Sequence, residues 1–288
     1  MISGNSPGRL WFVSALLLGW AAQASDAASC VWKVSSPSGA TLYLGGSAHA
    51  LRSSDYPLPA PYNRALEASS HLVFETDMQT NEAATKGLVK AGRYPKGDSL
   101  KNHVDPRTYA YVRRYFSLRN IPEQKYSTYR PWLIELILES PPTENAQLGV
   151  ERYLHQRALA SHKPITGLES ADEHMATFLG LNDREGEALL LIHFINLGRT
   201  DLGGGTMLDA WRRGDADTLA RHLHAAYQDF PAFADRIVTA RNRRWIPKIE
   251  SYIKSGQTYF VVAGAGHMGG SEGVVALLRA RGYKVEQW

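Results

Sequence analysis

The chain has 288 residues, of which 44% are hydrophobic, so it is long enough to bury one sizeable core or two closely joined ones. Its 32 lysine and arginine residues nearly balance 28 aspartate and glutamate residues, and the formal net charge is only +4. No cluster of basic residues is interleaved with aromatic residues, which disfavours a nucleic-acid partner.

Residues 1–27 have the pattern of a signal peptide. Arg9 precedes a thirteen-residue apolar run at residues 10–22, and small residues follow this run. A run of this length suits the hydrophobic region of a secretory signal and is too short to cross a bilayer. We therefore expect residues 28–288 to form the mature chain, located in the periplasm or secreted, and without a transmembrane segment.

Cys30 is the only cysteine, so no intramolecular disulfide can form. The preceding residues, Ala28 and Ser29, give the sequence Ala-Ser-Cys, which resembles the end of a lipoprotein cleavage site. Ala27, however, stands where a leucine is usual. A lipid anchor at Cys30 is therefore an alternative to a cleaved chain without lipid.

Runs of apolar and β-branched residues alternate along the chain with helical patterns. The predicted strands are residues 31–34, 41–44, 71–74, 165–168, 258–263 and 283–285. The predicted helices are residues 62–69, 131–138, 150–161, 186–197, 207–227, 234–253 and 273–281.

The strands gather towards both ends of the sequence, and the stretch from about residue 106 to residue 252 is largely helical. This distribution predicts a single α/β domain over residues 28–288. We expect a central mixed, largely parallel sheet built from the N- and C-terminal segments and flanked by helices. The helical middle would be an insertion folded over that sheet.

Four side chains suited to metal binding or proton transfer follow predicted strands. His49 and His267 each end a Gly-x-x-His motif, and Glu75 and Glu169 come directly after their strands. In open α/β sheets the ligand crevice lies beyond the carboxyl ends of the strands. If these strands run parallel, all four side chains converge on that crevice.

Two imidazoles with one or two carboxylates form a donor set that suits manganese, cobalt, zinc or iron and leaves coordination positions for water. A metal bound there would lower the pKa of its water and polarise a carbonyl group. Glu75 or Glu169 could serve as ligand or as general base, and the residues alone leave both roles open.

Several segments resemble the signature of the TraB/GumN/Tiki family. They are Leu-Tyr-Leu-Gly-Gly-Ser-Ala-His at residues 42–49, Leu-Val-Phe-Glu-Thr-Asp at 72–77, Arg-Pro-Trp at 130–132, Gly-Leu-Glu at 167–169, Arg-Asn at 241–242, and Phe-Val-Val-Ala-Gly-Ala-Gly-His-Met at 260–268. The resemblance implies a fold shared with erythromycin-esterase-like and haem-binding ChaN-like proteins. For the Tiki branch it implies a metal-dependent protease that prefers manganese or cobalt. It also assigns His49, Glu75 and His267 to the metal site, with Arg241 as an electrostatic helper.

The preferred hypothesis is therefore an exported metal-dependent hydrolase of peptide bonds, with His49, Glu75 and His267 as ligands. A first alternative is a protein that binds haem or another small molecule in the same crevice without turnover. A second is a metal-free, esterase-like hydrolase in which Glu75 activates water. The expected partner is a peptide or small-molecule substrate.

Overall fold

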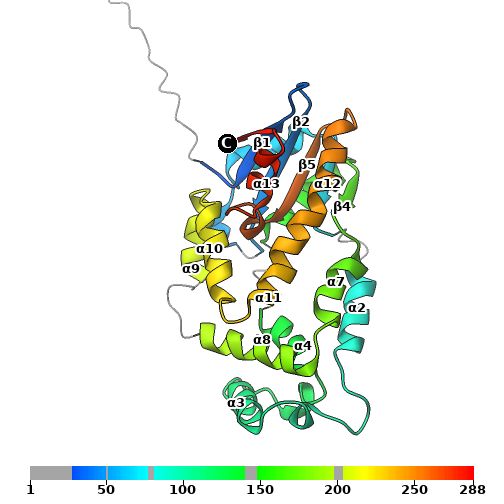
Figure 1. Ribbon diagram of the computed structural model, residues 1–288, viewed down its shortest axis with the longest axis vertical. Coiled ribbons are helices and arrows are strands. Elements are labelled where there is room, and N and C mark those ends of the chain that lie inside the picture. The colour runs from blue at the N-terminus through cyan, green and yellow to red at the C-terminus, as the bar shows by residue number, and fades with distance from the viewer. Residues whose placement is uncertain (1–27, 50, 77–80, 140–147, 198–203) are drawn as a thin grey trace, which may run out of the picture.

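The computed structural model describes residues 28–49, 51–76, 81–139, 148–197 and 204–288 (Figure 1). The predicted signal peptide lies outside these residues. Among the helices that are described, none is both long enough and apolar enough to cross a membrane.

The core of the protein is one six-stranded sheet. Its strands are β1 (Val31–Ser35), β2 (Thr41–Ser47), β3 (His71–Phe74), β4 (Ile165–Gly167), β5 (Tyr259–Gly264) and β6 (Lys284–Gln287). The spatial order is β4-β3-β5-β2-β1-β6. The first four strands in this order pair in parallel, whereas β1 is antiparallel to both β2 and β6. All six predicted strands and the mixed, largely parallel sheet are thus confirmed.

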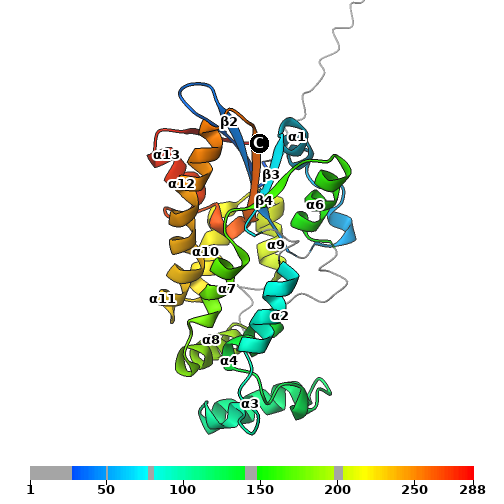
Figure 2. The same cartoon turned by 90° about the vertical axis from the view of Figure 1, so that its right-hand side faces the viewer.

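Helices cover both faces of this sheet. They are α1 (Ala60–Ala68), α6 (Val150–Ala160), α12 (Ala240–Lys254) and α13 (Val274–Ala280). Figure 2 shows α12 and α13 on one face, with α1 and α6 on the other. Central strands with two covered faces are apolar throughout rather than alternating. Accordingly Leu44, Phe260 and Val262 are fully buried.

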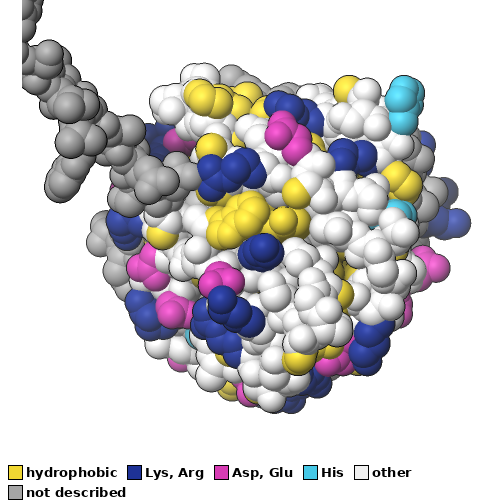
Figure 3. Space-filling model, turned by 90° about the horizontal axis from the view of Figure 1, so that it is seen from above, with side chains coloured by type: hydrophobic (Ala, Val, Ile, Leu, Met, Phe, Trp, Pro, Cys, Tyr) yellow, Lys and Arg dark blue, Asp and Glu magenta, His cyan; other side chains and the backbone are white. Residues whose placement is uncertain are grey.

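The remaining helices extend from the end of the sheet at which the parallel strands terminate (Figure 1). They are α2 (Asn81–Ala91), α3 (Pro106–Ser117), α4 (Pro131–Glu139), α7 (Ala171–Leu179), α8 (Asp183–Asn196), α9 (Gly204–Arg212), α10 (Ala216–Ala226) and α11 (Pro231–Ala234). A π-helix, Asp235–Thr239, joins α11 to α12. At the opposite end of the molecule, basic and acidic side chains are interspersed and form no basic stripe on the face that Figure 3 shows.

The single helix predicted over residues 207–227 is in fact two helices, α9 and α10. Gly214 separates them with a φ of +70°, a conformation that glycine adopts readily and other residues avoid. The side chain of Asp215 then accepts a hydrogen bond from the backbone N–H of Thr218 and caps α10. The helical periodicity continues across both helices and therefore hides the break between them.

Helices α2, α3 and α7 were not singled out from the sequence, although α3 and α7 lie in the stretch expected to be largely helical and the sequence carries start signals for both. Asp105 caps α3 and Pro106 occupies its first position. Ser170 and Glu173 form a reciprocal capping box at the start of α7. These capping residues mark the start of each helix directly.

The position of Cys30 bears on the lipid-anchor alternative. Its side chain is 1% exposed and packs in the main hydrophobic core, and its Sγ lies 3.7 Å from the carbonyl oxygen of Trp211. Burial raises the pKa of the thiol to about 12. Attachment of a lipid to Sγ would therefore require Cys30 to leave the core.

Candidate active site

The four side chains predicted from the sequence lie at the same edge of the sheet. The parallel strands β2 and β5 lead into the loops that carry His49 and His267. Glu75 directly follows β3, and Glu169 follows its parallel neighbour β4 by two residues. The parallel pairing of β3 with β5 brings the four strand ends together.

A cavity of about 530 Å³ lies at this edge. Its polar and charged lining consists of Ser47, His49, Glu75, Glu139, His174, Arg241 and His267. Its apolar lining includes Met207, Leu208 and Trp211 from α9, Leu219 and Leu223 from α10, and Ile237 and Val238 from the π-helix. The three predicted ligands and Arg241 thus line one cavity. Glu169 does not line it; its side chain is buried behind Arg241.

Close packing of the two histidine loops depends on Gly46. A Cβ at this position would lie 2.9 Å from Cβ of Ala265, and 3.0 Å from Cβ of Cys30. Gly46 pairs with Ala263 in the parallel register of β2 and β5. The absence of a side chain therefore lets the strand that leads to His49 approach the loop that leads to His267.

Arg241, on α12, is buried and holds two carboxylates. Its Nη2 donates to Glu75 Oε2 and to Glu169 Oε1, both at 2.5 Å, and its Nε lies 3.1 Å from Glu169 Oε1. Trp245 donates its Nε1–H to the other oxygen of Glu169 at 3.2 Å. Glu169 is therefore engaged in fixing Arg241, and of these two carboxylates only Glu75 lines the cavity.

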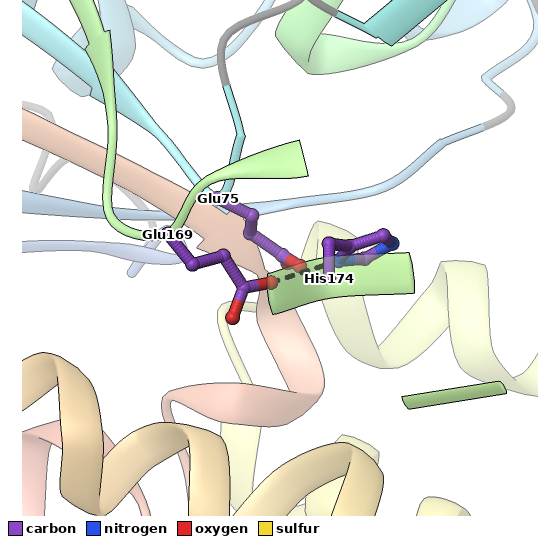
Figure 4. Close-up of side chains that lie close together, drawn as sticks. All are labelled: Glu75, Glu169 and His174. Atoms are coloured by element: carbon purple, nitrogen blue, oxygen red, sulfur yellow. Dashed lines mark hydrogen bonds and ion pairs between the residues drawn. The ribbon is translucent and has the colours of Figure 1, made fainter. Parts of the chain in front are cut away.

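Arg241 occupies the space between three side chains that could otherwise bind a metal ion. Glu75, Glu169 and His174 offer ligand atoms that all lie within 4.8 Å of one another (Figure 4). Arg241 Nη2 contacts all three residues, because it also lies 3.2 Å from His174 Nδ1. The guanidinium group supplies the positive charge that a metal ion would supply among these three side chains.

The Nε2 lone pair of His267 faces Arg241, whose Nη1 donates to it. His267 Nδ1 lies 2.7 Å from Asn242 Oδ1, and Asn242 Nδ2 donates to the carbonyl oxygens of His267 and Glu272. These two carbonyl contacts fix the orientation of the amide, so Nδ1 carries the proton of the neutral imidazole. Burial lowers the pKa of His267 to about 4, so the ring is neutral near pH 7. Its Nε2 lies 3.9 Å from Glu75 Oε1 and 3.3 Å from Arg241 Nη1.

His49 is held at the same ring position by a different group. Its side chain is 70% exposed, and its Nδ1 lies 3.2 Å from Oε1 of Glu151, in the first turn of α6. The Glu151 carboxylate raises the pKa of His49 to about 9. With Nδ1 engaged, Nε2 is the nitrogen that faces a ligand; because a ring with this pKa is protonated near pH 7, a metal ion bound there would displace the Nε2 proton.

Glu75 is a fixed negative charge. Burial alone would raise the pKa of its carboxyl group, but Arg241, His267 and the Gly264 N–H together bring this pKa well below its usual range. The Gly264 N–H donates to Oε1 at 2.7 Å, and Arg241 donates to Oε2. Because both oxygens accept a hydrogen bond, the carboxylate has a single orientation relative to His267.

Sequence reasoning assigned no role to His174 or Trp245 and did not single out Glu151. His174 lies in α7, five residues after Glu169 and 2.8 Å from it, a contact that no spacing rule for strands predicts. Glu151 and Trp245 are ordinary helical residues in the sequence. Only the packing of α6 and α12 on the sheet brings them to the site.

The fold and site define a class: an α/β protein with paired Gly-x-x-His loops and a carboxylate–arginine network at the carboxyl edge of its sheet. The sequence model of the TraB/PrgY/gumN family matches residues 30–287, so the chain belongs to this family.

Two of its relatives are bacterial. The uncharacterized protein YbaP of Escherichia coli (strain K12) is 24% identical over 84% of this chain and 89% of its own length. The YbaP of Shigella flexneri is 25% identical over 82% of this chain and 87% of its own length. A metalloprotease TIKI homolog of Nematostella vectensis is 21% identical over 80% of this chain, which corresponds to 60% of that protein's length.

Proposed function

We propose that this protein is a metal-dependent hydrolase of peptide bonds in which His49, Glu75 and His267 hold a divalent ion. One observation carries the proposal. The three side chains line a single cavity, and the Nδ1 atoms of both histidines are engaged away from the ligand position. Similarity to a metalloprotease TIKI homolog supports the assignment to peptide hydrolysis.

The residue types present suit such an ion. His267 Nε2 and Glu75 Oε1 lie 3.9 Å apart, whereas the ligand atoms of His49, Glu75 and His267 do not all lie within 4.8 Å of one another in this structure. Two imidazole Nε2 atoms and a carboxylate suit manganese, cobalt, zinc or iron. At the site, the three negative charges of Glu75, Glu151 and Glu169 exceed the two positive charges of Arg241 and of protonated His49. A divalent cation would neutralise this excess negative charge. When bound, such an ion lowers the pKa of water and polarises a carbonyl group.

The protein's own groups would orient the donors and the substrate. Arg241 and the Gly264 N–H fix the two oxygens of Glu75, and Asn242 fixes the ring of His267. Glu169 is saturated by Arg241, His174 and Trp245, so we assign the ligand or base role to Glu75. The apolar residues of α9 and α10 form the opposite wall, where an apolar part of a peptide would displace water.

Metal analysis of the purified mature chain tests this assignment. We expect manganese or cobalt to bind to the wild type and to bind much more weakly to His49→Ala and to His267→Ala. His71→Ala is a matched control, since His71 begins β3 at the opposite end of that strand and stacks on Tyr259. Unchanged metal content in both site variants would overturn the proposal.

A metal-free hydrolase is a second candidate, favoured by one specific observation. Arg241 already neutralises the charge of Glu75 without any ion. Peptide or ester hydrolysis that survives exhaustive chelation would support this candidate. Loss of hydrolysis on chelation, with recovery on addition of Mn²⁺, would support the metal-dependent enzyme.

We also propose that the protein is exported and that the mature chain begins near residue 28. The signal-like pattern of residues 1–27 supports this location. Mass spectrometry of the protein from a periplasmic or culture fraction should find residues 1–27 removed. An intact N-terminus on the folded protein would argue against export by this route.

A further inference from the structure

We infer that Glu151 is the positioning residue for His49, so that carboxylate, imidazole and bound ion act as one unit. This inference rests on the proposed function. Among the described residues, Glu151 is the only polar side chain that His49 contacts, at 3.2 Å from its Nδ1. An imidazole that is 70% exposed would otherwise have freedom to rotate.

The carboxylate of Glu151 is itself held in place. Its side chain is 18% exposed, and its Oε1 accepts a hydrogen bond from the hydroxyl of Ser47 at 2.5 Å. The same oxygen contacts Nδ1 of His49. Ser47 at the end of β2 and His49 in the following loop are thus both held by one oxygen of Glu151 in α6. Glu151 also lies in the first turn of α6, where the positive end of the helix dipole stabilises a carboxylate.

The backbone fixes α6 against the histidine loop. The N–H of Val150 donates to the carbonyl oxygen of Ala48 at 3.1 Å. A Cβ at Gly149 would lie 2.6 Å from the carbonyl oxygen of His49, so only glycine permits this approach. Residues 149–151 thus dock on residues 47–49 through backbone and side chain together, and the direction of the His49 ring follows from this docking.

The two histidines have chemically different supports. Asn242 gives His267 a neutral amide oxygen, whereas Glu151 gives His49 a charged carboxylate. A carboxylate that accepts from Nδ1–H makes Nε2 a stronger donor to a metal and fixes the ring direction. Loss of such a partner typically weakens metal affinity by about 10- to 100-fold. Glu151 should therefore influence metal affinity without touching the ion.

The test is a thermodynamic cycle on the mature chain, with Co²⁺ titrated and both calorimetric affinity and visible absorption recorded. We expect Glu151→Gln to weaken Co²⁺ binding by about 10- to 100-fold and to change the absorption spectrum. In a His49→Ala background the same substitution should have little further effect, because Glu151 acts through that imidazole. Glu67→Gln on α1 is the control: its side chain is 69% exposed and 3.8 Å from Arg157, and its Co²⁺ affinity should match that of the wild type.

The outcomes separate this inference from the function on which it rests. If His49→Ala leaves Co²⁺ affinity unchanged, the proposed metal site itself is wrong. If His49→Ala weakens binding and Glu151→Gln does not, only the positioning role is wrong. Equal effects of Glu151→Gln with and without His49 would show a general structural role and would also overturn it. Should Glu151→Gln not fold, Glu151→Asp takes its place in the cycle, with reduced affinity expected from its shorter reach.

Discussion

Substitution of Arg241 by methionine is the sharpest test of how the site is held together. Methionine keeps an unbranched apolar stem and removes the guanidinium group. Glu75 and Glu169 then each lose the hydrogen bond from Arg241 Nη2, which lies 2.5 Å from both carboxylates. The two negative charges stay next to each other without their shared positive partner. The cation contact over the ring of Trp245, at 4.7 Å from its centroid, is lost as well.

Removing one partner of a buried ion pair destabilises a protein by roughly 3–5 kcal/mol, because the remaining charge stays desolvated. Arg241 is 5% exposed and Glu169 is 6% exposed, so the energies measured for buried ion pairs apply here. We therefore expect Arg241→Met to lower the free energy of unfolding by about 3–5 kcal/mol at pH 7. For an m-value of about 2–3 kcal/mol/M, the urea midpoint would fall by about 1–2.5 M.

The pH dependence of this loss has a definite sign. In the wild type the pKa values of Glu75 and Glu169 are lowered in the fold, so their stabilisation is present at neutral pH and is lost on acidification. In Arg241→Met, burial without a partner raises both pKa values. The carboxyl groups then take up protons as the pH falls. The stability difference between wild type and variant should therefore shrink from pH 7 towards pH 4.

Urea unfolding followed by circular dichroism measures this difference. The matched control is Arg243→Met, on the same helix, whose side chain is 62% exposed and pairs with Glu272 at 3.0 Å. An exposed pair of this kind contributes less than about 1 kcal/mol. If the two variants lose equal stability at pH 7, the buried network around Arg241 does not have the role described above.

Three further predictions concern single residues of the site and core. Burial holds the pKa of His267 at about 4, below the ordinary value of 6.5. Protonation of this ring should therefore contribute roughly 3 kcal/mol to the fall in the free energy of unfolding between pH 7 and pH 4. Unfolding curves measured across this pH range should show a smaller fall for His267→Gln than for the wild type. Gly46→Ala should lower the thermal unfolding midpoint, because overpacking against Ala265 costs about 1–3 kcal/mol. Gly87→Ala in α2 is the control: a Cβ there meets nothing within 4 Å, so the midpoint should stay unchanged or rise. Cys30 should react with a thiol reagent only in denaturant; rapid labelling of the native protein would contradict its burial.

Short-range patterns in the sequence were enough to predict the strands of the sheet and which three candidate ligands lie near one another. Each of the six strands is an apolar or β-branched run between turn residues, and such a run identifies a strand without knowledge of its neighbours. The rule that parallel strands direct their carboxyl ends to one crevice then placed His49, Glu75 and His267 together. The structure brings these three residues into one cavity, and their metal-binding role stays a prediction.

The helical part was less predictable because local signals there are ambiguous. Apolar periodicity predicted one helix where the structure has α9 and α10. The positive φ of Gly214, which separates them, leaves no signal in that periodicity. Helix α3 was missed, although its capping residue Asp105 and first residue Pro106 mark its start. Capping chemistry is therefore the sequence signal that would improve the prediction of this region.

The sequence by itself determined the strands, the glycine loops and the positions of the candidate ligands, since each depends on residues close together in the chain. Only the tertiary structure decided which carboxylate faces the cavity and which residues support the histidines. Arg241 and Glu75 are 166 residues apart, and Glu151 and Ser47 are 104 residues apart. Contacts over such separations depend on how helices dock on the sheet, and this docking follows from the packing of the whole core.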